Sequence, residues 1–111
     1  MWLFTNTGFV SAVKQGSNLV VRARDAESLE PIADSINSEI IHTPEADYPY
    51  RVITDSETFA KWTQHMAKNI DYPNFKSEVA QVRGHEFAHA LSRVWSVMHE
   101  VEDDKARNQT N

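Results

Sequence analysis

A chain of 111 residues, 41% of them hydrophobic, is long enough to bury one hydrophobic core and too short for two. Its 11 Lys and Arg residues against 16 Asp and Glu give a formal net charge of −5, which disfavours the clustered cations of a phosphate-binding surface, so no nucleic-acid partner is expected. The chain has no cysteine, no signal-peptide pattern and no run near the ~18 apolar residues of a membrane span. We therefore expect a cytoplasmic protein with no disulfide and no membrane partner.

Three short strands are predicted in the N-terminal third, because apolar and aromatic runs alternate there with Asn, Gly and Ser. In the third run, Leu19, Val21 and Ala23 fall on one face. Arg22 and Arg24 fall on the other, which is typical of a sheet with one wet face. These arginines, with Lys14 on the neighbouring strand, could form a small anion site, although a solvated sheet face is favoured. The runs are WLFT (2–5), FVSAVK (9–14) and LVVRAR (19–24).

The first helix is predicted to begin at Ser28, so that Pro31 lies in the first turn, where no amide donor is needed. Its buried stripe is Leu29, Ile32, Ala33 and Ile36. Two further strands are predicted at 39–42 and 50–53.

The second helix is predicted to follow a capping box in which Thr54 bonds the amide of Glu57. A last helical region runs from Phe75 to Val101, with Gly84 as a kink or cap. The three tryptophans, Trp2, Trp62 and Trp95, are expected to anchor the core. The stripe of the second helix is Phe59, Trp62, Met66 and Ile70.

This β-β-β-α-β-β-α-α order predicts an α+β fold: a two-layer sandwich with a mainly antiparallel sheet and helices on one face. The strand, helix, strand step would pair its two strands in parallel, as in ferredoxin-like units. We expect one domain over residues 1–101 and a polar, disordered tail over 102–111.

The stretch HEFAH (85–89) matches H-E-x-x-H, in which two imidazoles on one helix face hold zinc and the glutamate activates the bound water. His85 and His89 would be the ligands and Glu86 the general base. On a helical wheel centred on Phe87, however, both histidines point away from the core, and no third ligand follows at the usual spacing. We therefore expect a solvated helix face without metal or cofactor, with a minimal zinc-dependent hydrolase as the alternative. The expected buried stripe of that helix is Phe87, Leu91, Val94, Met98 and Val101.

The segment Asp47 to Arg51 places two aromatic side chains and a cation next to a proline. Tyr48, Tyr50 and Arg51 suit a recognition loop, because tyrosine and arginine make large contacts at small entropic cost. Alternatively, the tyrosines simply cover the sheet edge.

The stretches MWLFT, VRAR, DYPYRV, IDYPNFKSEV and RVWSVMHE together resemble a family of short, stand-alone bacterial proteins for which we know no activity. The resemblance covers nearly the whole chain and implies a single domain. It supplies no function. We expect a non-catalytic interaction or regulatory domain, which binds a protein partner or a second copy of itself through the 48–51 loop or a free sheet edge.

Overall fold

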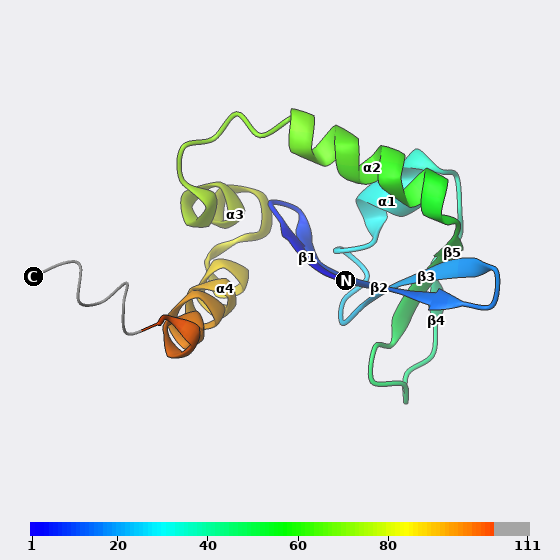
Figure 1. Ribbon diagram of the computed structural model, residues 1–111, viewed down its shortest axis with the longest axis horizontal. Helices are drawn as coiled ribbons and strands as arrows, with labels where there is room; N and C mark the ends of the chain where they lie inside the picture. Colours follow the sequence, from blue (N-terminus) through cyan, green and yellow to red (C-terminus); the bar gives the residue numbers. More distant parts are fainter. Residues whose placement is uncertain (104–111) are drawn as a thin grey trace, which may run out of the picture. The chain divides into compact units, whose positions relative to one another are not determined.

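The computed structural model of the chain describes residues 1–103. These residues form an antiparallel sheet and four α-helices, which confirms the predicted α+β class. The chain divides into two compact units, Met1–Pro73 and a second that begins at Asn74 (Figure 1). The predicted tail, 102–111, lies outside the described residues except for Glu102 and Asp103.

The first unit holds a five-stranded sheet in which every neighbouring pair is antiparallel. The spatial order is β1-β2-β3-β5-β4. Its strands are β1 (Trp2–Thr5), β2 (Gly8–Gln15), β3 (Asn18–Ala23), β4 (Ile41–His42) and β5 (Tyr50–Thr54).

The predicted parallel pair across the first helix does not form. Strands β3 and β4 run in the same direction, since each is antiparallel to β5, but β5 lies between them. This is a split strand-helix-strand arrangement of the ferredoxin type. Strand β4 has only two residues, whereas β5 has five and places the fully buried Val52 beside Val21. The longer strand therefore takes the position next to β3.

The core lies on one face of this sheet, which we call the inner face, and α1 (Glu30–Ser35) and α2 (Ser56–Lys68) cover it (Figure 1). The strand alternation predicted from the sequence is confirmed there, because Val21 and Ala23 are fully buried. Lys14 pairs with Leu19 and so points to the inner face, whereas Arg22 points to the opposite face. Lys14 therefore does not join Arg22 in an anion site. The core residues are Val10, Ala12, Val21, Ala23, Leu29, Ile32, Ala33, Val52, Phe59 and Trp62.

The second unit is a pair of helices, α3 (Phe75–Arg83) and α4 (His85–Val97), followed by one 3-10 turn (Met98–Val101). Gly84 separates the helices with a φ of 93°, a conformation that side-chain-bearing residues rarely adopt. Gly84 is therefore the predicted cap, at the C-terminal end of α3, and not a kink within one helix.

This break changes which face of α4 is buried. Because α3 packs against α4, the buried positions are Ala88 and Leu91. The predicted stripe was right for Leu91, but Val94, Met98 and Val101 are exposed.

The tryptophans also differ from expectation. Trp62 is buried, but Trp2 and Trp95 are 67% and 60% exposed, so they are not core anchors. Trp95 lies beside the Lys76 ammonium, 5.0 Å from the ring centroid, in a contact that needs no burial.

Both predicted helix starts are shifted. Helix α1 begins at Glu30, and Ser28 is buried with its hydroxyl accepting the Phe9 amide at 3.2 Å. Helix α2 is capped by Asp55 instead of Thr54, because the Asp55 carboxylate accepts the Thr58 amide at 2.8 Å. Hydrogen bonds from Thr58 lower the pKa of Asp55 below its ordinary value of 3.8.

This cap predicts a pH-dependent contribution to stability. A carboxyl group whose pKa is lowered on folding stabilises the fold above its unfolded pKa, and that stabilisation is lost as the pH falls through the folded pKa. Asp55→Ala should lower the Tm at pH 7, and its difference from the parent should shrink in acid. Asp55→Asn keeps the cap without the titration, so it is the control. An Asp55→Ala deficit of equal size at pH 7 and in strong acid would contradict the assignment; thermal unfolding followed by circular dichroism measures it.

Candidate functional site

The structure does not bring the three predicted recognition residues onto one surface. Tyr48 is 7% exposed, and the Arg22 and Arg24 guanidiniums lie over its ring at 4.4 and 4.6 Å. Its ring also lies 6.4 Å from the ring of Phe9. Tyr48 therefore packs against the face of the sheet that α1 and α2 do not cover. We call this face the outer face.

Tyr50 and Arg51 are adjacent in β5 and so point to opposite faces of the sheet. Tyr50 packs against the core and stacks on His42 with ring centroids 4.5 Å apart, at the β4 edge. Arg51 is half-buried and pairs across the outer face with Arg22. Tyr48 and Arg51 therefore both lie on the outer face beside Arg22, whereas Tyr50 points to the inner face.

The HEFAH residues lie at the start of α4. His85 and His89 are exposed and border a shallow depression between α3 and α4, together with Lys76, Ser77 and Ser92. Within residues 1–103, no three His, Cys, Asp or Glu side chains are grouped so that they could hold a metal ion. The Lys76 side chain borders the same depression, and its ammonium opposes binding of a divalent cation.

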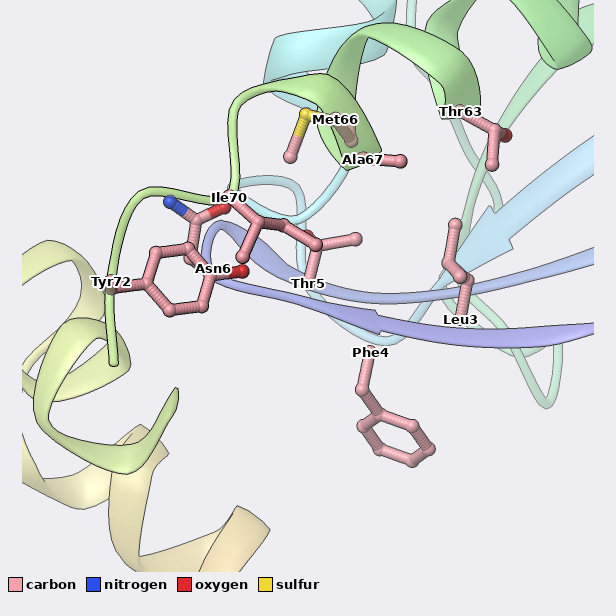
Figure 2. Close-up of a pocket in the computed structure, with 9 residues that line it drawn as sticks. All are labelled: Leu3, Phe4, Thr5, Asn6, Thr63, Met66, Ala67, Ile70 and Tyr72. Atoms are coloured by element: carbon pink, nitrogen blue, oxygen red, sulfur yellow. The ribbon is translucent and has the colours of Figure 1, made fainter. Parts of the chain in front are cut away.

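The first unit contains an apolar pocket between strand β1 and the C-terminal half of α2 (Figure 2). Its volume of about 130 Å³ is similar to the ~150 Å³ cavity that accommodates benzene in a protein core. None of the lining side chains carries a formal charge. The walls are Leu3, Thr5, Thr63, Met66, Ala67 and Ile70, with Asn6 and Tyr72 at one end.

The pocket exists because α2 and the segment after it extend over an edge strand. Leu3 and Thr5 line the pocket on the inner side of β1, while the Phe4 ring points to the opposite side of the strand (Figure 2). Ile70, just beyond the end of α2, is 59% exposed at the pocket wall. An exposed apolar wall beside a sheet edge is a feature that a peptide-binding protein uses.

Strand β1 also has an unpaired backbone edge, because it is the first strand in the sheet order and pairs only with β2 among the described strands. Met1 and Ala12 exchange both backbone hydrogen bonds, each at 2.8 Å. Because such pairs alternate along an antiparallel ladder, the amides and carbonyls of Trp2 and Phe4 point away from β2. The pocket and this row of free peptide groups adjoin each other on one strand.

Only part of this pocket is predictable from the sequence. The spacing of Met66 and Ile70 predicted apolar positions on one helix face, and we interpreted both as core. Met66 is partly buried, and Ile70 is exposed because α2 ends at Lys68. The order of the strands, which makes β1 an edge, could not be read from the pattern.

No helix within residues 1–103 is long and apolar enough to cross a lipid bilayer. Comparison of the chain with protein-family models, with curated proteins and with solved structures gives no match. The candidate site therefore rests on geometry alone.

The zinc alternative has a direct test in the metal content of the purified protein. We expect less than about a tenth of an equivalent of zinc, since no third ligand lies beside His85 and His89 within residues 1–103. The measurement is diagnostic because a structural or catalytic site would retain its zinc through purification. Stoichiometric zinc that His85→Ala and His89→Ala both remove, measured by plasma emission spectrometry with Arg93→Ala as the control on α4, would contradict this expectation.

Proposed function

We propose that the chain is a cytoplasmic, non-catalytic interaction module that binds an extended segment of a partner protein along the free edge of β1. One aliphatic side chain of that segment occupies the pocket between β1 and α2. The observation that carries the proposal is the position of an uncharged, apolar pocket directly beside unpaired backbone groups.

In strand addition, the unpaired backbone groups of β1 and the pocket would have different roles. The outward amides and carbonyls of Trp2 and Phe4 can pair with the backbone of any extended peptide, which supplies affinity without reading its sequence. Alternate side chains of an added strand point to the inner side, where the pocket selects an aliphatic group. The lack of a formal charge in the lining disfavours a charged residue at that position.

A short peptide suits this edge better than a second copy of the chain. Strand β1 has four residues, which span roughly 13 Å. Two strands paired over that length, with one side chain in one pocket, bury less surface than the ~800 Å² per partner that stable dimers usually bury. A monomer that captures short peptides is therefore the expected behaviour, and self-pairing through β1 is the competing outcome.

The zinc-hydrolase alternative gains no support from the described residues. It needs a third ligand beside His85 and His89, and no such group occurs within residues 1–103.

Filling the pocket should abolish peptide binding. Peptides selected from a displayed random library against the full chain serve as the probe. Ala67→Arg, at an exposed position in the pocket wall, should weaken their binding at least tenfold, equivalent to ~1.4 kcal/mol. Ala60→Arg is the matched control, since Ala60 is exposed on the same helix and does not line the pocket.

Fluorescence anisotropy with the selected peptides measures both variants. A selection that yields no peptide, or peptides that bind Ala67→Arg as tightly as Ala60→Arg, contradicts the proposal. A parent protein that is dimeric in light scattering and becomes monomeric in Ala67→Arg would show that a second copy is the occupant.

Removing one outward amide of β1 should also weaken the binding of the same peptides. Trp2→Pro deletes the ring and the amide, whereas Trp2→Ala deletes the ring alone, so the difference between them isolates the backbone hydrogen bond. A bond worth ~1 kcal/mol predicts that Trp2→Pro binds about fivefold more weakly than Trp2→Ala. Equal affinities would show that the peptide does not pair with β1.

A further inference from the structure

Two arginines face each other across the outer face of the sheet. Arg22 of β3 and Arg51 of β5 are direct cross-strand partners, so their Cβ atoms lie roughly 4.5–5.5 Å apart. Both side chains are half-buried. Like charges directly opposite each other destabilise a sheet, and a pair kept in this position needs a physical reason.

No acidic group of the described part of the chain neutralises this pair. The neighbouring Arg24 is ion-paired with Asp47 at 3.2 Å and donates to the Asp47 carbonyl at 2.7 Å. By contrast, no carboxylate within residues 1–103 forms an ion pair with Arg22 or Arg51. Three guanidiniums and one carboxylate leave a local charge of +2 on a chain whose formal net charge is −5.

The Arg22 side chain is fixed in place. Its Nη2 donates to the hydroxyl of the buried Ser11 at 2.8 Å, and its guanidinium lies 4.4 Å from the centroid of the Tyr48 ring. The Nε atoms of Arg22 and Arg51 are both buried and have no hydrogen-bond partner. Buried donors without acceptors are uncommon, because each loses its hydrogen bonds to water without a replacement.

We propose that Arg22 and Arg51 form a site for a phosphate monoester, with Ser11 and Tyr48 holding Arg22 in position. Planar guanidiniums match the oxygens of phosphate in a two-bond fork, and a dianion offsets the repulsion between the two arginines. Two cations suit one phosphate group. A nucleic acid would need a longer cationic track, which the acidic chain does not offer. This site lies on the outer face and is independent of the pocket at β1.

Inorganic phosphate is the probe for the shared chemistry. Added at constant ionic strength to the full chain, it should raise the Tm above the value in sodium chloride and saturate. Arg22→Gln and Arg51→Gln should each lose this rise. Arg93→Gln, which removes the same charge from the exposed face of α4, should retain it.

The variants also separate a binding site from a structural role. In chloride, Arg51→Gln should be as stable as the parent or more stable, because the like-charge repulsion is gone. If a glutamine variant fails to fold, Arg51→Lys replaces it. Lysine keeps the charge but cannot donate two parallel hydrogen bonds, so the phosphate affinity should fall several-fold. A rise no larger than that in chloride, or an equal rise in all variants, overturns the proposal as a general salt effect.

Two further ligands identify the source of the phosphate. Glycerol 3-phosphate and a phosphoserine peptide, titrated while backbone amide shifts of Ser11 and Arg22 are followed by NMR, represent a small metabolite and a modified protein. If either ligand binds more tightly than inorganic phosphate, this supports a monoester ligand and indicates whether it comes from a metabolite or from a protein. If neither ligand changes the amide shifts of Ser11 and Arg22, the proposal is overturned.

Discussion

The packing of α1 and α2 against one face of the sheet determines how the first unit is built. Ile32 of α1 and its N-cap residue Leu29, with Phe59 and Trp62 from α2, pack against alternate residues of the three central strands. Each fully buried aliphatic side chain contributes roughly 1.5–3 kcal/mol through removal from water. This cluster covers the inner face, whereas the outer face and the two edge strands, β1 and β4, lie outside it.

The two proposed sites are consequences of that one-sided core. At the β1 edge, α2 and the residues after it extend over the strand, which leaves Ile70 at the wall of an apolar pocket beside unpaired peptide groups. On the outer face, Arg22 and Arg51 stand opposite each other without a carboxylate partner among residues 1–103. Both features cost stability in the isolated chain, which is a common property of binding sites.

The sequence was informative where a local period decided the structure and uninformative where packing between distant segments did. Strict alternation placed Val21 and Ala23 in the core, and helical spacing placed Leu29 and Ile32 there. The parallel pairing failed because strand order depends on β5 returning beside β3, which no local pattern encodes. The pocket was missed for the same reason. The sequence predicts Tyr48 either as a contact residue or as a cover of the sheet edge, and no local pattern shows that it folds back onto the outer face, where its ring lies under Arg22.

Peptide binding at β1 requires that its outer edge is free, and amide hydrogen exchange measured by NMR reports on that edge residue by residue. In the unliganded monomer, the amide of Leu3 faces β2 and should be protected, whereas that of Phe4 should exchange as fast as an exposed amide. Binding of a selected peptide should protect Phe4 and leave Leu3 unchanged. Protection of Phe4 equal to that of Leu3 in the peptide-free monomer would contradict the account, because the edge would then already be occupied.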